Sequence, residues 1–133
     1  MIVIHCLDDE EIVGEWLKDL FPRETYEVKI FSSPIQFIGA FSDKVDLVIT
    51  DMKVPGYDLH TTLKHFKEIR EGVYIIVISG YIRDNNFLIP LFPLGVSYVI
   101  EKTASGKDWL IELKKAVENL LPRMLKREYF LEL

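Results

Sequence analysis

Five short runs of apolar and β-branched residues alternate along the chain with segments in which apolar residues recur every three or four positions. Continuous apolar runs are typical of strands buried on both faces of a parallel sheet. One run, 26–31, alternates between apolar and polar residues and is expected to lie nearer an edge. The runs predict strands over 2–7, 26–31, 47–50, 73–78 and 95–100. Because strands and helices alternate, we expect βαβ units and an α/β fold with a parallel sheet, in a chain too short for an eight-stranded barrel.

The periodic segments predict about five helices, with one apolar face of each packed on the sheet. The second helix is expected to start at a serine cap, with Pro34 in its first turn. The residues expected to face the sheet are Ile12, Val13, Trp16, Leu17, Leu20 and Phe21 in the first helix, Ile35, Phe37, Ile38 and Phe41 in the second, Leu59, Leu63, Phe66 and Ile69 in the third, and Trp109, Leu110, Leu113, Val117 and Leu120 in the last.

Prolines interrupt the pattern in the fourth helical segment. Pro90 and Pro93 lack the N–H that an α-helix interior requires, so 84–94 is not expected to form one regular α-helix. We expect a short helical turn after Asp84 and then irregular chain to Gly95. Its apolar residues should pack inward or offer an apolar contact surface: Phe87, Leu88, Leu91 and Phe92.

The end of the chain is also marked by a proline. Pro122 is expected to stop or kink the last helix. The segment that follows, 123–133, mixes charged and apolar residues. Three interpretations of it stay open: a helical extension, the start of a linker, or a dimer contact.

Composition narrows the class of protein. A chain of 133 residues corresponds to about one domain. The net charge of −5 argues against non-specific binding to nucleic acid or to an anionic membrane. The single cysteine, Cys6, is expected to be buried and inert, which fits a reducing compartment. No apolar run approaches the ~20 residues that span a bilayer, and the first residues do not resemble a signal peptide, so we expect a cytoplasmic protein.

Polar residues follow four of the predicted strands: Asp8 and Asp9, Asp51, Ser79, and Lys102. The carboxyl ends of parallel strands lie at one edge of a sheet, so these side chains should converge. Three clustered carboxylates invite a divalent cation, and oxygen ligands favour Mg²⁺ or Mn²⁺. A lysine and a hydroxyl suit a phosphoryl group. An aspartate beside a metal and a lysine has the equipment to form an aspartyl phosphate.

Simpler interpretations exist for several of these residues. Asp8 and Asp9 stand where a helix begins, and acids there also cap free N–H groups and favour the helix dipole. His5 lies inside a strand and is expected to be a core histidine. His60 and His65 are five residues apart, whereas a zinc pair on one helix face needs a spacing of four, so both are interpreted as ordinary helix residues.

Taken together, these motifs resemble the receiver domains of two-component response regulators. The resemblance covers Ile2 to Leu121 and is carried by the segments 7–10, 51–58 and 79–80 and by Lys102. It implies a flavodoxin-like, doubly wound five-stranded sheet with strand order 2-1-3-4-5. It also implies a receiver domain over 1–121, with 122–133 as a C-terminal extension or the start of a linker.

The resemblance assigns a role to each site residue. Asp51 would be the phosphoacceptor, and Asp9 and Asp51 would bind the metal directly. Asp8 would bind it partly through water, and the backbone carbonyl of Lys53 would be a further ligand. Ser79 would fill the family's hydroxyl position, and Lys102 would be the phosphate-binding lysine.

The resemblance also implies partners. A sensor histidine kinase or a histidine phosphotransfer protein would donate the phosphoryl group, and a conformational switch would signal to an output domain or protein partner. A homodimer is a further possibility, and direct binding to nucleic acid or membrane is not expected. Two alternatives stay open: a pseudo-receiver that signals without phosphate, and a phosphatase or phosphotransferase of the haloacid-dehalogenase type. The second requires another aspartate where this chain has Lys53.

The chain departs from the family pattern in three places. Thr103 stands where the family usually has proline. Val99 stands where it usually has an aromatic switch residue, with Tyr98 one position earlier. The two prolines of the fourth helical segment are expected to remodel the usual signalling face.

Overall fold

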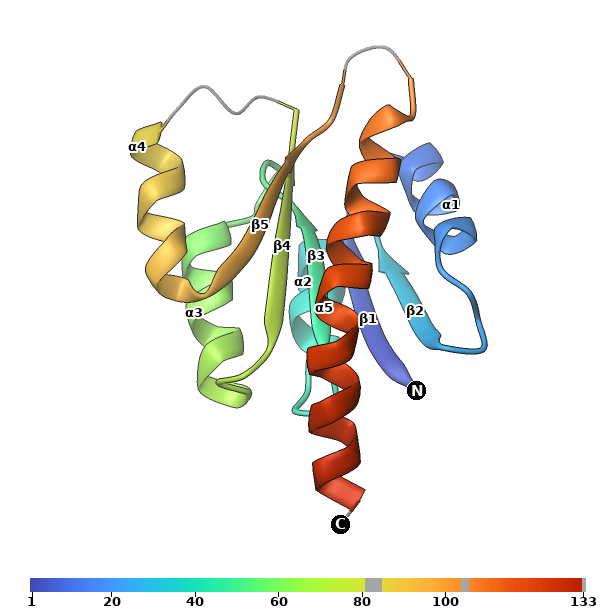
Figure 1. The fold of residues 1–133 in the computed structure, drawn as a ribbon. Helices are drawn as coiled ribbons and strands as arrows, with labels where there is room; N and C mark the ends of the chain where they lie inside the picture. Colours follow the sequence, from blue (N-terminus) through green and yellow to red (C-terminus); the bar gives the residue numbers. More distant parts are fainter. Residues whose placement is uncertain (81–84, 104–105, 133) are drawn as a thin grey trace.

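A five-stranded parallel sheet with strand order β2-β1-β3-β4-β5 forms the centre of the protein (Figure 1). The computed structural model describes residues 1–80, 85–103 and 106–132. The strands are β1 (Ile2–Leu7), β2 (Tyr26–Phe31), β3 (Leu47–Asp51), β4 (Tyr74–Ser79) and β5 (Val96–Glu101). The predicted flavodoxin-like, doubly wound α/β fold and its strand order are therefore confirmed, with the alternating strand β2 at an edge.

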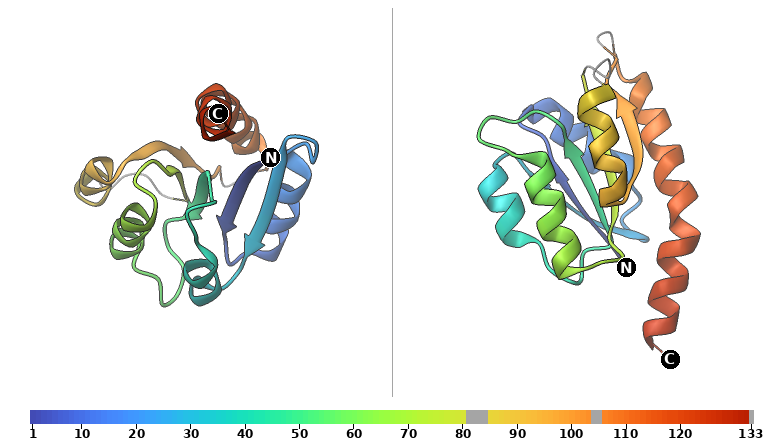
Figure 2. Two further views of the ribbon diagram at one scale, coloured as in Figure 1. Left: turned by 90° about the horizontal axis from the view of Figure 1, so that it is seen from below. Right: turned by 90° about the vertical axis from the view of Figure 1, so that its left-hand side faces the viewer.

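Helices cover both faces of the sheet (Figure 2). One face packs against α1 (Glu11–Leu20) and α5 (Asp108–Glu132). The other packs against α2 (Pro34–Ala40), α3 (Leu59–Ile69), α4 (Asn85–Leu88) and the 3₁₀-helix η1 (Ile89–Leu94). Successive strand residues point to opposite faces. Ile4 and Cys6, for example, pack on the α1 and α5 side, whereas Leu7 packs on the other. This explains why the central strands read as continuous apolar runs.

The faces of three helices differ from the prediction. Ile12, in the first turn of α1, is 48% exposed, although Val13 and Leu17 of the same helix are buried. In α2, Phe37 is fully buried but Ile35 is 84% exposed. Two residues correspond to a rotation of about 200° around a helix, so Ile35 cannot share the face of Phe37. Ile69, in the last turn of α3, is 39% exposed, although Leu63 and Phe66 of the same helix are fully buried. The predicted inward positions of Ile12, Ile35 and Ile69 are therefore wrong.

The fourth helical segment is broken, as predicted, but it is not irregular. One turn of α-helix, α4, is followed directly by η1. Pro90 falls in the first turn of η1, where no N–H donor is required. The segment ends at Gly95, whose φ of 83° is left-handed and whose N–H donates to the carbonyl of Phe92. The prediction of irregular chain is wrong because i→i+3 turns accommodate this sequence, and Asp84 itself lies outside the described residues.

The last helix continues through Pro122 to Glu132, so of the two predicted outcomes, a stop or a kink, the stop is wrong. The proline ring removes one hydrogen bond, to the carbonyl of Glu118. Contacts beyond the proline compensate: Met124 is fully buried, and the Arg127 guanidinium lies 4.8 Å from the ring centre of Tyr74. Figure 1 shows α5 extending past the lower end of the sheet. The helical-extension interpretation is therefore the one that the structure supports for 123–132.

None of the helices in the described parts of the chain has the length and apolar character needed to span a membrane.

Candidate functional site

The polar residues predicted from the strand ends meet at one edge of the sheet. The register aligns the ends of neighbouring strands, with Leu7 paired to Thr50, Asp51 to Ile78, and Ser79 to Glu101. A hollow of about 300 Å³ opens at this edge. Its lining residues are Asp9, Glu10, Asp51, Met52, Lys53, Ser79, Gly80 and Lys102.

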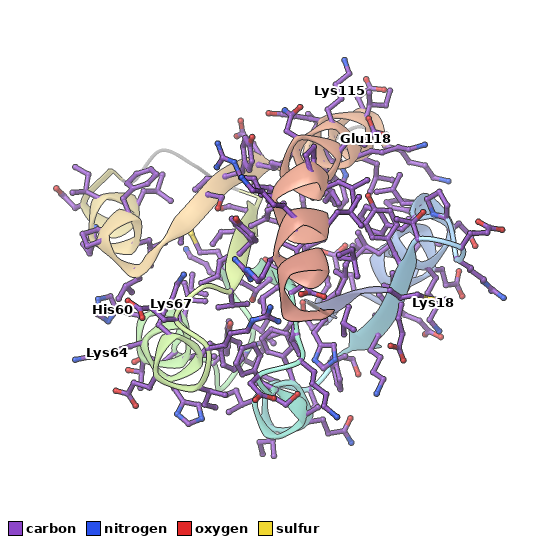
Figure 3. The ribbon with its side chains drawn as sticks, turned by 60° about the horizontal axis from the view of Figure 1, so that its bottom comes forward. Lys18, His60, Lys64, Lys67, Lys115 and Glu118 are labelled. Carbon is purple, nitrogen blue, oxygen red and sulfur yellow. The ribbon has the colours of Figure 1, made fainter. Side chains whose placement is uncertain are left out.

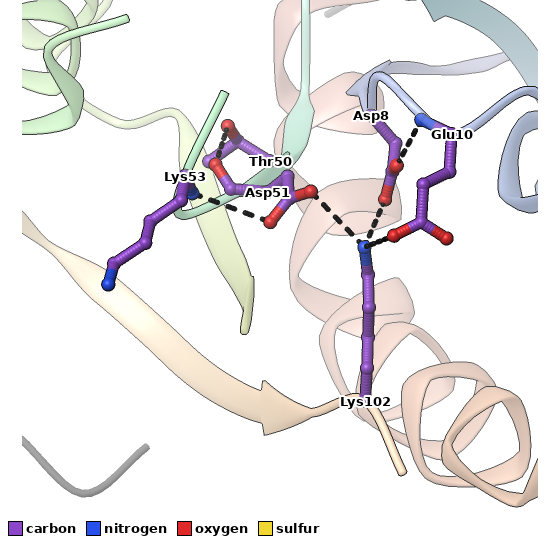
Figure 4. A network of polar contacts seen from close by, with 6 residues as sticks. All are labelled: Asp8, Glu10, Thr50, Asp51, Lys53 and Lys102. Carbon is purple, nitrogen blue, oxygen red and sulfur yellow. Dashed lines mark hydrogen bonds and ion pairs between the residues drawn. The ribbon is translucent and has the colours of Figure 1, made fainter. Parts of the chain in front are cut away.

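Lys102 is the central contact of the site (Figure 4). Its Nζ lies 2.7 Å from Oδ2 of Asp8, 3.1 Å from Oδ2 of Asp51 and 3.9 Å from Oε1 of Glu10. Its main chain is fixed as well, because its N–H donates to the carbonyl of Ser79 at 2.7 Å. The lysine ammonium therefore bridges the ends of β1 and β3.

Burial and charge act against each other in this contact. Burial raises the pKa of Asp8, and the Lys102 ammonium and the Glu10 N–H only partly oppose that rise. Burial alone would lower the pKa of Lys102, but Asp8 and Asp51 outweigh it, so the net shift is upward. Lys102 therefore remains a cation at neutral pH.

The acid pair also serves the start of α1. Oδ1 of Asp8 accepts the N–H of Glu10 at 2.9 Å, ahead of the helix. Glu10 itself is the N-cap and makes no side-chain capping bond. Asp8 therefore holds the main chain just before α1 and caps none of the N–H groups inside the helix, so the capping interpretation is wrong for Asp8. Its other oxygen, Oδ2, faces Lys102.

Carboxylate oxygens of Asp8, Asp9 and Asp51 all lie within 4.8 Å of one another. Asp8 and Asp51 are buried, whereas Asp9 is exposed. Oδ2 of Asp8 is buried, and its close neighbour is the Lys102 ammonium at 2.7 Å. Three hard carboxylate oxygens this close together fit Mg²⁺ or Mn²⁺.

Lys53 and Ser79 complete the arrangement. The N–H of Lys53 points to Oδ1 of Asp51 at a long 3.5 Å, and the Lys53 side chain is exposed. The metal role of the Lys53 carbonyl stays a prediction. Ser79 is only 3% exposed and lines the hollow beside Asp51 and Lys102. Every residue predicted for the site is thus brought to this edge of the sheet.

Three residues of the site were not predicted. Glu10 comes within ion-pair distance of Lys102, and its place directly after the acid pair was the available signal. Thr50 and Tyr57 form hydrogen bonds behind Asp51. The pattern places Thr50 in a strand, and the sequence offers no sign that a tyrosine seven residues later contacts it.

The histidines take no part in the site. His5 is 4% exposed, packs 5.2 Å from the ring of Phe31, and has a pKa lowered mainly by burial, which confirms a core histidine. His60 and His65 are exposed on α3. Figure 3 shows His60 on the same side of that helix as Lys64 and Lys67, a cationic surface that does not favour a metal ion.

The residues at the switch position lie on opposite faces of β5. Val99 packs with the α2 and α3 side of the core, whereas Tyr98 packs with the α1 and α5 side. A register shift between Ile75 and Ile76 separates this part of β5 from its start. Tyr98 therefore does not stand in for an aromatic side chain at position 99.

The fold and the acid–lysine arrangement define a receiver-type signalling domain. The family model for the response regulator receiver domain matches residues 4–115. The chain therefore belongs to the receiver domain family of two-component systems.

Relatives agree with this assignment. Sporulation initiation phosphotransferase F of Bacillus subtilis is 30% identical over 79 residues, which are 59% of this chain and 64% of that protein. An uncharacterized transcriptional regulatory protein of the same bacterium is 25% identical over 116 residues, 87% of this chain. The chain spans only 51% of that second relative.

Solved structures share the fold. A CheY-like receiver domain protein from Methanospirillum hungatei superposes with a TM-score of 0.81 at 20% identity, covering 96% of this chain and 98% of that one. The response regulator TrrA from Thermotoga maritima, solved in complex with Mg²⁺ and BeF, gives a TM-score of 0.68 at 23% identity, covering 87% and 99%.

Proposed function

We propose that Asp51 accepts a phosphoryl group from a phosphohistidine of a sensor histidine kinase or a histidine phosphotransfer protein. The observation that carries the proposal is the Asp51 carboxylate, which lies 3.1 Å from the Lys102 ammonium and within a cluster of three acids. The reaction depends on Mg²⁺ or Mn²⁺, and the phosphorylated domain changes conformation to signal.

The atoms of the reaction follow from these groups. An oxygen of Asp51 attacks phosphorus, forming a P–O bond while the P–N bond to the imidazole of the donor breaks. Lys102 neutralises charge on the phosphoryl oxygens, and the Ser79 hydroxyl donates a hydrogen bond to one of them. Asp8, Asp9, Asp51 and the Lys53 carbonyl would hold the cation, which supplies further charge neutralisation. Water later hydrolyses the acyl phosphate and restores Asp51.

Two comparisons support the proposal. One relative is named a phosphotransferase, and one neighbour was solved with Mg²⁺ and BeF. The alternative of a pseudo-receiver is not favoured, because the acids, the hydroxyl and the lysine are all present and grouped.

The domain boundaries and partners belong to the same proposal. We take 1–121 as the receiver unit and 122–133 as an extension towards an output domain, a protein partner or a second copy. We propose that the reaction takes place in the cytoplasm, together with its phosphohistidine donor.

Incubation with acetyl phosphate and Mg²⁺ tests the proposal. The intact mass should rise by one phosphoryl group in the unmodified protein and in Asp58→Asn. Asp58 is a matched control because it is an exposed aspartate of the same loop, and asparagine retains its capping of α3. Asp51→Asn should remain unlabelled, and full labelling of that variant would overturn the assignment.

A further inference from the structure

Two hydroxyl groups behind Asp51 form a hydrogen-bonded chain that ends on its main chain. Oγ1 of Thr50 donates to the carbonyl oxygen of Asp51 at 2.9 Å, a contact visible in Figure 4. The Tyr57 hydroxyl lies 2.9 Å from the same Oγ1. A threonine hydroxyl has one proton and a carbonyl has none. Because Thr50 gives its proton to Asp51, Tyr57 must donate to Thr50.

Neighbouring side chains bury much of this pair of hydrogen bonds. Thr50 is fully buried, and the ring of Tyr57 packs edge-on against Phe37 at 6.3 Å. Burial raises the pKa of Tyr57 above its ordinary value, so the phenol keeps its proton. Successive hydrogen bonds shielded from water strengthen one another. The two hydrogen bonds therefore link the side chain of Tyr57 to the main chain of Asp51.

The link closes the loop that carries Lys53. Pairing between β3 and β1 ends at Thr50, whereas pairing between β3 and β4 continues through Asp51. After Asp51 the chain turns at Gly56, which has a left-handed φ of 75°, and Tyr57 donates its N–H to the carbonyl of Val54 at 3.1 Å. The Tyr57 hydroxyl thus ties the end of the loop back to its beginning.

We propose that Tyr57 is a positioning residue that acts through Thr50 to hold the Asp51 peptide and the following loop in the geometry required for cation binding and phosphoryl transfer. The kinetic consequence rests on the proposed function, while the effect on the loop does not. Without the Tyr57 hydroxyl, Thr50 loses its donor, and the main chain from Asp51 to Lys53 is held less firmly.

Hydroxyl-deletion variants test the relay. Tyr57→Phe keeps the ring, Thr50→Val keeps the shape, and Thr50→Ser keeps the hydroxyl. Tyr26→Phe is the control, because Tyr26 is a buried tyrosine at the start of β2, away from the site. Three quantities are measured: amide hydrogen exchange of Lys53 and Val54, the Mg²⁺ dissociation constant, and the labelling rate with acetyl phosphate at saturating Mg²⁺.

Tyr57→Phe should accelerate exchange of the loop amides, weaken Mg²⁺ and slow labelling, each by about 3- to 10-fold, the range expected for one hydrogen bond. Thr50→Val should have at least the same effect, and adding Tyr57→Phe to it should change nothing more, because the relay is already broken. Thr50→Ser should keep all three quantities at the values of the unmodified protein, because serine retains the hydroxyl. Tyr26→Phe should alter none of them.

The two proposals can fail separately. If Tyr57→Phe leaves loop exchange and Mg²⁺ affinity at the values of the Tyr26→Phe control, or if the two deletions add independently, the relay is wrong. If the unmodified protein is not labelled at all, the proposed function fails, while loop exchange still decides the relay.

Discussion

The Asp8 carboxyl group is the least hydrated acid of the site, with a side chain that is 0% exposed. Its raised pKa means that its charge is held in the folded protein at a cost in free energy. The proposed cation site would account for that cost, because it needs a charged oxygen at this position. On that proposal, Asp8 lowers stability in return for cation binding.

Asp8→Asn should consequently raise the metal-free melting temperature at pH 7 and weaken Mg²⁺ binding. A carboxyl group whose folded pKa is raised favours folding below its unfolded pKa, near 3.8, and this advantage is lost as the pH rises through the folded pKa. The difference in melting temperature between the variant and the unmodified protein should therefore shrink as the pH falls towards 3.8. Thermal denaturation without metal between neutral and acid pH measures it. A variant that is less stable at neutral pH would contradict this account.

At the scale of secondary-structure elements, the effect of a proline on a helix depends on its position in that helix. Pro90 occupies a first turn, whereas Pro122 lies inside a long helix and leaves the carbonyl of Glu118 without its intrahelical donor. The contacts of Met124 and Arg127 hold the helix together beyond that point.

Pro122→Ala should increase the free energy of unfolding by about 1–3 kcal/mol, since alanine restores the missing N–H and is the better helix former. Pro90→Ala is the matched control and should change it by less than about 1 kcal/mol, because a first-turn proline removes no required donor. Chemical denaturation of both variants measures the effect. Equal effects of the two substitutions, or a loss of stability in Pro122→Ala, would contradict the role assigned to the helix beyond residue 122.

At the scale of the whole molecule, one sheet supports two cores. The side chains of α1 and α5 pack on one face and those of α2, α3 and η1 on the other. Trp16 and Trp109 both belong to the first core. Because every strand is shared by the two cores, neither should persist without the other.

Urea unfolding followed by tryptophan fluorescence and by far-ultraviolet circular dichroism should therefore give coincident transitions. The first signal reports the α1 and α5 side, and the second reports all helices and strands. A fluorescence midpoint clearly separated from the circular dichroism midpoint would show that the two cores unfold independently.

The pattern of the sequence predicts the convergence of Asp9, Asp51, Ser79 and Lys102, because parallel strands bring their carboxyl ends to one edge. The strand order followed only from the resemblance to receiver domains, since a pattern of apolar runs does not say which strands are neighbours. The sequence pattern does not predict features that depend on tertiary contacts between residues distant in the sequence. The contacts of Met124 that carry α5 past its proline lie far apart in the chain. The contact between Thr50 and Tyr57 depends on how a turn folds back, which no periodicity encodes.

The proposed function depends on Asp51 forming an acyl phosphate, and trapping that group tests the proposal most directly. Treatment of the phosphorylated protein with borohydride reduces an aspartyl phosphate to homoserine, and peptide mass mapping then identifies the residue. If Asp51 is the phosphoacceptor, homoserine is found at position 51 alone. It forms only when Mg²⁺ or Mn²⁺ and a phosphodonor are both present. Homoserine at Asp8 or Asp9, or none at position 51 in a protein that has gained a phosphoryl group, would contradict it.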